Sequence, residues 1–255
     1  MYSRSIEDYL KAIYRLQNQR DQVETLALAK EMGVAAPSAT RMIQRLANMG
    51  LVHYQPYIGV ALTASGQKIA LQAIRRHRLL ECFLIEKLGL SWEQAHAEAD
   101  VLEHVISEDL ADRMETQLGY PITDPYGSPI PDRHGVIVAS ATTRLSDLQP
   151  GQTALIAEVS DHDPALLSYL SSLELFPGAE IRLIAIEPFG GSLIVQVGQI
   201  ERPVGREAAY HIFVTENKAD TAPQAPNHKQ TEGQRFEWKK PLNKTMMAKL
   251  RVAVE

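Results

Sequence analysis

Cysteine and long apolar runs are scarce in this sequence of 255 residues. The one cysteine, Cys82, rules out a disulfide bond within the chain. The longest apolar runs fall far short of the roughly 20 residues that a membrane-spanning helix needs, and the first residues lack the apolar stretch of a signal peptide. We therefore expect a cytoplasmic protein that makes no use of a membrane.

Carboxylates are missing from one long segment. No Asp or Glu lies between Glu31 and Glu81, and residues 1–80 contain eleven Lys or Arg against five Asp or Glu. Residues 81–120 reverse this balance, with ten acidic and two basic side chains, which the overall formal charge of −5 conceals. A basic region suits nucleic acid and an acidic, histidine-containing region suits a cation, although two solvated charged surfaces would also explain the pattern.

Apolar spacing and turn residues organise the first part of the chain. Spacings of three and four predict an amphipathic helix over residues 5–17, and shorter helices are expected over 26–32 and 38–49. Residues 51–63 are typical of a β-hairpin. A helix, a helix–turn–helix and a hairpin in this order predict a winged helix–turn–helix. Further helices are expected over about 63–88 and 91–118. The composition shifts at about residue 140, after which short strands are expected over 154–159, 181–186, 193–197 and 211–214, with one helix over 164–173 between the first two.

The second helix of a helix–turn–helix lies in the DNA major groove, with its first turn nearest the base edges. Arg41 could reach guanine or phosphate and Arg45 a phosphate, and Tyr57 would contact the DNA backbone from the wing. A three-helix unit that binds only protein is the alternative, which the missing carboxylates disfavour. The predicted DNA-binding residues are Pro37, Ser38, Ala39, Thr40, Arg41, Arg45 and Tyr57.

Histidines and carboxylates recur at helical spacing after the winged helix. His77 and Glu81 are four residues apart, and four further side chains lie at 0, +4, +7 and +8 of the next expected helix, within an arc of roughly 100°. Repulsion among these carboxylates would cost stability unless a cation compensates. Without a thiolate, the set suits Mn(II), with Fe(II) next. The four side chains are His96, Asp100, Glu103 and His104.

Four motifs of the sequence are distinctive: IEDYLKAIY at 6–14, RHRLLE at 76–81, EHVISE at 103–108 and DPYGSPIP at 124–131. Together they resemble the diphtheria-toxin-repressor and manganese-transport-regulator family of metal-dependent repressors. The resemblance covers about residues 3–215 and implies an N-terminal winged helix–turn–helix (1–72), a helical metal-binding and dimerisation domain (73–139) and an all-β SH3-like, FeoA-like domain (140–215). The last residues, 216–255, are polar and rich in Pro, Gln and Lys, a composition that predicts a disordered tail. The resemblance further implies a homodimer that binds a palindromic operator in double-stranded DNA and represses metal-uptake genes when metal is replete.

The resemblance also implies two metal sites. The regulatory site would use Asp8, Asp100, Glu103 and His104, and the ancillary site would use His77, Glu81, His96 and Asp163 from the SH3-like domain. Iron-sensing members have Met at the position of Asp8 and Cys at that of Asp100. The carboxylates here favour Mn(II), with Fe(II) possible. Binuclear manganese sensors have Glu where this chain has Lys11, which argues against their closely bridged metal pair.

Two other functions compete with a metal-dependent regulator. A winged-helix regulator with a non-metal effector would have an apolar pocket and would not respond to a chelator. A metallohydrolase could use the same cluster, but the sequence has no obvious nucleophile motif or substrate loop. We therefore expect that the chain is not an enzyme.

Overall fold

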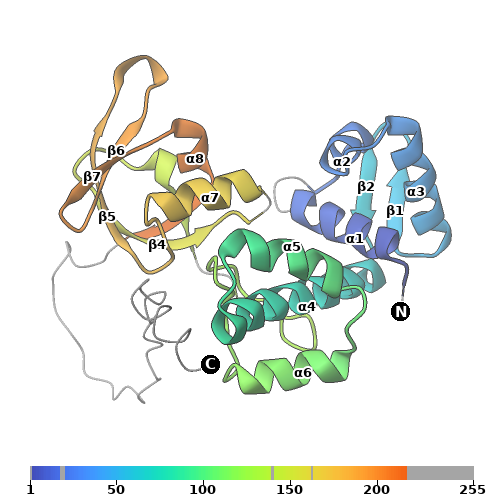
Figure 1. Ribbon diagram of the computed structural model, residues 1–255. Coiled ribbons are helices and arrows are strands. Elements are labelled where there is room, and N and C mark those ends of the chain that lie inside the picture. The colour runs from blue at the N-terminus through green and yellow to red at the C-terminus, as the bar shows by residue number, and fades with distance from the viewer. Residues whose placement is uncertain (1, 18–20, 139–140, 162, 217–255) are drawn as a thin grey trace, which may run out of the picture. The chain divides into compact units, whose positions relative to one another are not determined.

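The computed structural model describes residues 2–17, 21–138, 141–161 and 163–216, so residues 217–255 of the predicted tail lie outside it. The N-terminal part is the expected winged helix–turn–helix, with three helices packed around an antiparallel hairpin (Figure 1). Its core contains Leu10, Ile13, Ile43 and Leu46, all fully buried. The elements are α1 (Arg4–Gln17), α2 (Thr25–Glu31), α3 (Ala36–Asn48), β1 (Val52–Gln55) and β2 (Gly59–Leu62).

Helix α4 (Ala64–Leu88) connects the winged helix to the rest of the chain. The Thr63 side chain caps its N-terminus by accepting a hydrogen bond from the Gly66 amide. Gly89 ends the helix in the left-handed region, with φ of 70°. Both α1 and α5 (Trp92–Leu102) pack against α4. Over the described ranges, no helix is long and apolar enough to span a lipid bilayer.

The helix that we expected over residues 91–118 is divided in two. Helix α5 ends at Leu102, and α6 (Glu108–Gln117) begins after a turn. Ser107 has an extended backbone, and its side-chain oxygen accepts a hydrogen bond from the Leu110 amide at 3.2 Å. This cap starts a new helix where the periodicity suggested a continuous one. Glu103 and His104 consequently lie at and beyond the end of α5.

The C-terminal part is an all-β domain with one antiparallel sheet in the order β3-β8-β4-β5-β6-β7. The four predicted strands and the helix between the first two are present. Two strands were not predicted, β3, which has only two residues, and β7. The polar residues and Pro203 of β7 obscure its pattern, and such residues are tolerated at a sheet edge. The elements are β3 (Thr143–Arg144), η1 (Leu145–Asp147), β4 (Thr153–Val159), α7 (Pro164–Ser172), β5 (Glu180–Ile186), η2 (Pro188–Gly190), β6 (Leu193–Val197), β7 (Ile200–Val204), α8 (Arg206–Tyr210) and β8 (Ile212–Glu216).

An aromatic contact joins the helical part to the all-β domain. Trp92 of α5 and Tyr126 are buried in the core of the β domain, and the Tyr126 hydroxyl donates a hydrogen bond to the Trp92 carbonyl at 3.0 Å. Next to it, Gly127 has φ of 89°, and a Cβ there would lie 1.9 Å from the Ala157 carbonyl oxygen. Only glycine allows this approach. The contact places the segment after β4 beside α4 and α5.

Candidate functional site

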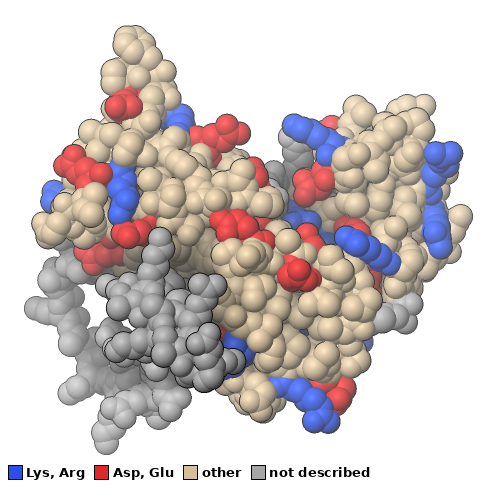
Figure 2. All heavy atoms as spheres, in the orientation of Figure 1, with Lys and Arg blue, Asp and Glu red and all other residues tan. Residues whose placement is uncertain are grey.

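Most of the predicted DNA-binding residues lie on the surface of α3 or in the β1–β2 turn. Arg41 and Arg45 are exposed, and Figure 2 shows Lys and Arg side chains along the outer edge of the winged helix over α3. Pro37 is also exposed, at the first turn of the helix. Tyr57 projects fully into solvent at the turn between β1 and β2. The helix and the wing thus present a basic face without carboxylates.

The first turn of α3 corrects one predicted contact. Ala39 is 0% exposed and belongs to the core of the winged helix, so its side chain cannot reach a DNA base. Thr40 donates a hydrogen bond to the Ala36 carbonyl at 2.9 Å, and Ser38 lies 3.3 Å from an Arg41 nitrogen. The helical periodicity that buries Ile43 also buries Ala39, four residues earlier.

One group of metal-ligating side chains joins α1 to the end of α5. We define the first group as Asp8, Glu103 and His104, whose ligand atoms all lie within 4.8 Å of one another. His104 Nε2 is 3.0 Å from Asp8 Oδ1 and 3.2 Å from Glu103 Oε1. Burial raises the pKa of Asp8, although His104 and Lys11 oppose the rise. A divalent cation would relieve the close approach of the two carboxylates.

Glu7 orients His104 and was not among the predicted site residues. Its Oε2 is 2.9 Å from His104 Nδ1, which leaves Nε2 directed toward Asp8 and Glu103. Glu7 is buried and is also paired with Arg76 at 3.1 Å. A carboxylate on the second ring nitrogen sets the tautomer of a ligating histidine. In the sequence, only the position of Glu7 next to Asp8 on α1 could have indicated this role. The direction of the Glu7 side chain depends on packing, which the sequence pattern does not give.

Lys11 contacts Glu103 from α1. Its Nζ lies 2.8 Å from both oxygens of Glu103, and both residues are buried. Burial opposes ionisation of this carboxyl, but a hydrogen bond from His77 and the charge of Lys11 outweigh it and lower the pKa of Glu103 to about 2. Glu103 is therefore a carboxylate at neutral pH.

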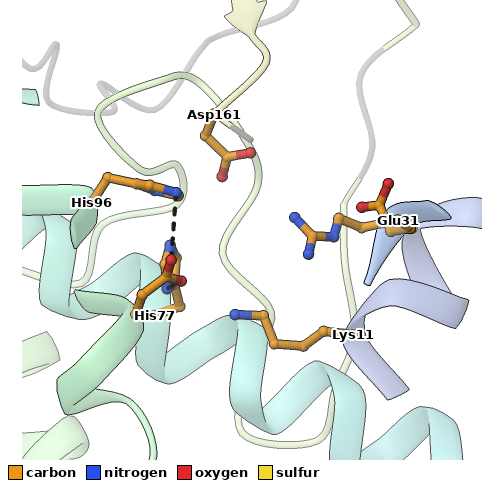
Figure 3. Close-up of a pocket in the computed structure, with 7 residues that line it drawn as sticks. Lys11, Glu31, His77, His96 and Asp161 are labelled. Atoms are coloured by element: carbon orange, nitrogen blue, oxygen red, sulfur yellow. Dashed lines mark ion pairs between the residues drawn. The ribbon is translucent and has the colours of Figure 1, made fainter. Parts of the chain in front are cut away.

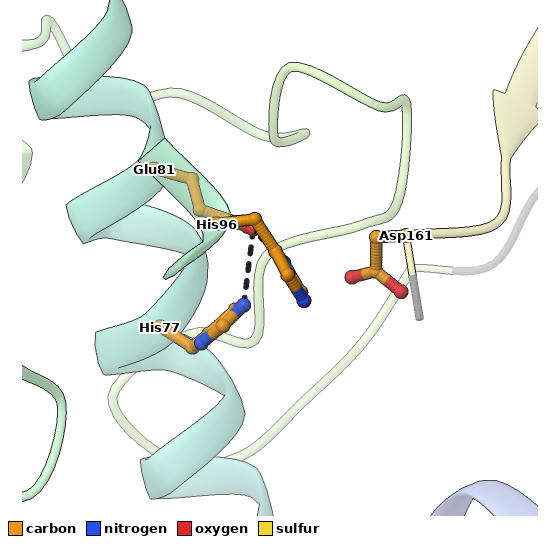
Figure 4. A group of neighbouring side chains, drawn as sticks. All are labelled: His77, Glu81, His96 and Asp161. Atoms are coloured by element: carbon orange, nitrogen blue, oxygen red, sulfur yellow. Dashed lines mark hydrogen bonds and ion pairs between the residues drawn. The ribbon is translucent and has the colours of Figure 1, made fainter. Parts of the chain in front are cut away.

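A second group of ligands lies between α4, α5 and the segment after β4 (Figure 4). It consists of His77, Glu81, His96 and Asp161, again with ligand atoms within 4.8 Å of one another. Glu81 Oε1 is 3.0 Å from His77 Nε2 and 2.8 Å from His96 Nδ1. Glu81 Oε2 is buried and has no hydrogen-bond partner among the described residues. An unsatisfied buried carboxylate oxygen beside two imidazoles fits a bound metal ion.

Charges within the second group compensate one another only in part. Burial disfavours the His77 imidazolium, but the adjacent Glu81 carboxylate prevails and raises the pKa of His77 to about 10. Burial also opposes ionisation of Asp161, yet Arg78 and nearby histidines lower its pKa to about 2. The group thus contains both carboxylates and a protonated imidazole at neutral pH.

The acidic residue that the β domain brings to this group is Asp161, two residues before the predicted Asp163. Asp163 instead caps α7, where its Oδ1 accepts a hydrogen bond from the Ala165 amide at 2.8 Å. An Asp followed by Pro suits the start of a helix, where the Asp side chain binds a backbone amide of the first turn. Figure 4 shows the Asp161 carboxylate turned toward the two histidines.

Asp100 lies away from the first group, to which the resemblance assigned it. It forms a third, overlapping group with His77 and Glu103. Asp100 Oδ1 is 3.5 Å from His77 Nδ1, and its side chain is 49% exposed. Beside it is a polar cavity of about 180 Å³, which Lys11, His96 and Asp161 also line (Figure 3).

A winged helix with a basic recognition helix, coupled to buried clusters of carboxylates and imidazoles, defines a DNA-binding protein that responds to a cation. Comparisons with known families agree. Residues 1–60 match the iron dependent repressor N-terminal DNA binding domain, residues 63–132 the iron dependent repressor metal binding and dimerisation domain, and residues 143–216 the FeoA domain.

Relatives and solved structures are similar along most of the chain. The iron-dependent repressor IdeR of Mycobacterium leprae is 30% identical over 220 residues, 82% of this chain and 95% of the relative. The transcriptional regulator MntR of Escherichia coli O157:H7 is 39% identical over 114 residues, 44% of this chain and 73% of the relative. A manganese-dependent transcriptional repressor in complex with manganese is 38% identical, with a TM-score of 0.77 over 83% of this chain and 100% of that one.

The chain belongs to the family of metal-dependent transcriptional repressors that includes IdeR, the diphtheria toxin repressor and MntR. This confirms the family that the sequence motifs indicated. Its relatives are repressors and not enzymes, which removes the metallohydrolase alternative.

Proposed function

We propose that this chain is a Mn(II)-responsive repressor, with Fe(II) as the second candidate ion, that acts in the cytoplasm as a homodimer on a palindromic operator. It would repress metal-uptake genes when metal is replete. The observation that carries the proposal is the first group, because Asp8 belongs to the DNA-binding part while Glu103 and His104 follow α5. One ion bound there would couple the two parts.

The donor atoms support Mn(II). The first and second groups offer only carboxylate oxygens and imidazole nitrogens, which suit Mn(II) and Fe(II). Cys82 is buried with its thiol near the Thr123 carbonyl, and burial raises the pKa of that thiol, so a thiolate ligand is disfavoured there. A similar repressor, ScaR, 31% identical, has been solved with Cd²⁺ and with Zn²⁺, so metal availability also matters.

The chain's own residues explain how an ion would alter DNA binding. A bound ion supplies positive charge to the first group, and Asp8 would then hold α1 to the end of α5. Helix α1 shares a core with α3 through Leu10, Ile13 and Ile43. The position of α1 therefore determines where α3 lies relative to the helical part.

Exposed apolar residues on and near α5 and α6 support a homodimer. Leu88, Val101, Val105 and Leu110 are all exposed, up to 70% for Val105, and lie within residues 63–132. Apolar side chains of this kind are typical of an interface between subunits. A two-fold dimer would present its recognition helices to two half-sites about 34 Å apart, which requires a palindromic operator.

Selection of DNA from random duplexes in the presence of Mn(II) tests this function and would give the operator directly. Binding of the selected DNA is then measured with Mn(II), Fe(II), Zn(II) and a chelator, for the wild type, Asp8→Ala and His104→Ala. We expect Mn(II) to stimulate binding by the wild type alone, while light scattering finds dimers of all three. Equal stimulation in both variants would refute the proposal.

The other function that competed at the sequence level, a winged-helix regulator with a non-metal effector, is disfavoured by the family of the chain and by the site. It would need an apolar pocket, whereas the cavity beside Asp100 is lined chiefly by charged residues. A non-metal effector would be favoured if DNA binding changed less on addition of a chelator than on removal of small organic molecules. We regard the buried ligand groups as the stronger observation.

A further inference from the structure

We infer that Arg76 of α4 is a positioning residue for the first group, which it arranges without being a ligand. The inference rests on the proposed function, because it assumes that the first group binds a metal ion. It deepens that function by naming the side chain that holds the ligands Glu103 and His104 in place for the ion.

The guanidinium of Arg76 contacts three segments that are distant in the sequence. Its Nε donates a hydrogen bond to the backbone carbonyl of Glu103 at 2.8 Å, and its Nη1 donates one to the Glu108 carboxylate at 2.6 Å. Its Nη2 lies 3.1 Å from Oε2 of Glu7. The end of α5, the start of α6 and α1 thus meet at one side chain, whose planar fork of donors suits acceptors in several fixed directions.

The contact with Glu7 leads directly to a ligand. The same oxygen of Glu7, Oε2, is 2.9 Å from His104 Nδ1. Glu7 is buried, and the charge of Arg76 compensates a carboxylate that is shielded from water. Arg76 therefore holds Glu7 where it orients the His104 imidazole, whose Nε2 is directed toward Asp8.

The contact with the Glu103 carbonyl fixes the turn that carries the other two ligands. The last carbonyls of a helix have no partner within their own helix, and Glu103 caps the C-terminus of α5. Arg76 supplies a donor to this carbonyl and also holds Glu108, the first residue of α6. The guanidinium thus spans the turn, and His104 lies between the two anchored ends.

The neighbouring Arg75 provides a contrast on the same helix. Arg75 and Arg76 are both buried, 2% and 4% exposed. Arg75 pairs with three carboxylates of α6 that belong to no ligand group, Asp112 at 3.0 Å, Glu115 at 2.8 Å and Glu108 at 3.9 Å. Both arginines therefore join α4 to α6, and of the two it is Arg76 whose contacts extend to the first group.

The test compares Arg76→Met with Arg75→Met, which removes an equally buried charge from the same helix. Arg76→Lys keeps the charge but cannot span three acceptors, and it decides the test if Arg76→Met does not fold. Mn(II) affinity of the full chain is measured by calorimetric titration, in the Glu81→Gln background for the first group and in the Asp8→Asn background for the second. Chemical denaturation with chelator measures the stability of each variant.

We expect Arg76→Met to weaken Mn(II) binding at the first group by about tenfold, as is typical when the partner of a ligand is lost, and Arg76→Lys to weaken it by less. Both should leave the second group unchanged, although its ligand His77 is the next residue on α4. Arg75→Met should lower stability and leave both affinities unchanged. Arg76→Met combined with Glu7→Gln should lose less affinity than the product of the two single losses, because Arg76 acts in part through Glu7.

Unchanged affinity at the first group in a folded Arg76→Met, or in Arg76→Lys where that variant decides, would overturn the inference. Equal losses at the two groups would do the same, because they would show a general distortion of α4. An equal loss in Arg75→Met would show that any buried charge between α4 and α6 suffices, which also contradicts it. A wild type that binds no Mn(II) would instead overturn the proposed function on which the inference rests.

Discussion

The first and second ligand groups differ in what they connect and in how far they are already assembled. The first draws Asp8 from α1 to residues that follow α5, and Asp8 remains partly exposed. In the second, Glu81 is fully buried and contacts both His77 and His96. A group that depends on one partly exposed residue from another domain suits a switch, whereas a buried, preassembled group suits a fixed tether to the β domain.

The two groups also differ in the charge that compensates their carboxylates. Lys11, which cannot leave α1, contacts Glu103 of the first group. In the second group, His77 supplies the charge, and an imidazolium can lose its proton. Metal binding should therefore displace or repel the charge of Lys11 at the first group, and it should release a proton from His77 at the second group.

The largest expected effect contrasts one carboxylate from each group. Asp8→Asn should abolish the stimulation of DNA binding by Mn(II), a loss of about 100-fold, since coupling between sites is typically 5–150-fold. Glu81→Gln should lose one bound ion but retain most of the stimulation. Fluorescence anisotropy with the selected operator measures both. Equal losses would show that the two groups do not have separate roles.

Removal of the Glu7 carboxylate should have the next largest effect. Glu7→Gln leaves His104 without the carboxylate on Nδ1 that holds its orientation. Loss of such a partner typically weakens metal affinity by about 10–100-fold. Calorimetric titration with Mn(II) should find the loss at the first group alone, and unchanged affinity there would contradict the role of Glu7.

Asp161 and Asp163 form a matched pair that tests the second group. Asp161→Asn should weaken Mn(II) binding at the second group by about tenfold, since it removes one charged ligand. Asp163→Ala should leave metal binding unchanged and cost about 1 kcal/mol of stability, because it removes only the cap of α7. Dialysis and chemical denaturation distinguish them, and the reverse assignment of effects would restore Asp163 as the ligand.

The smallest effect concerns pH. Because the pKa of His77 is raised to about 10, its contribution to stability is complete below the ordinary value of 6.5 and is lost as pH rises toward 10. The metal-free protein should therefore lose stability over this range. Between pH 7 and pH 8, Mn(II) affinity at the second group should rise by up to about tenfold, because the metal takes neutral imidazole. Denaturation with chelator, and calorimetry in buffers of different ionisation enthalpy, measure the two trends, and affinity that is independent of pH would contradict them.

Local patterns predicted the winged helix and most of the β domain. The helices that bury Leu10 and Ile43 follow from apolar spacing, and the hairpin and most strands follow from turn residues and alternation. The same reasoning merged α5 with α6, because it did not weigh the capping side chain of Ser107 against periodicity. It also placed Ala39 at the DNA surface, although its spacing from Ile43 assigns it to the core.

The types of ligand, and the pairing of His77 with Glu81, could be inferred from residues four apart on one helix, because helical geometry sets their relative directions. The membership of His96 in the same group followed from the family resemblance, because His96 lies on another helix. The use of Asp161 in place of Asp163, the separation of Asp100 from Asp8, and the contacts of Glu7 and Lys11 depend on how distant elements pack. Side chains at the ends of helices and in loops have no periodicity to direct them. Their partners are chosen by long-range packing, such as the contact of Trp92 with Tyr126 that brings the β domain against α5.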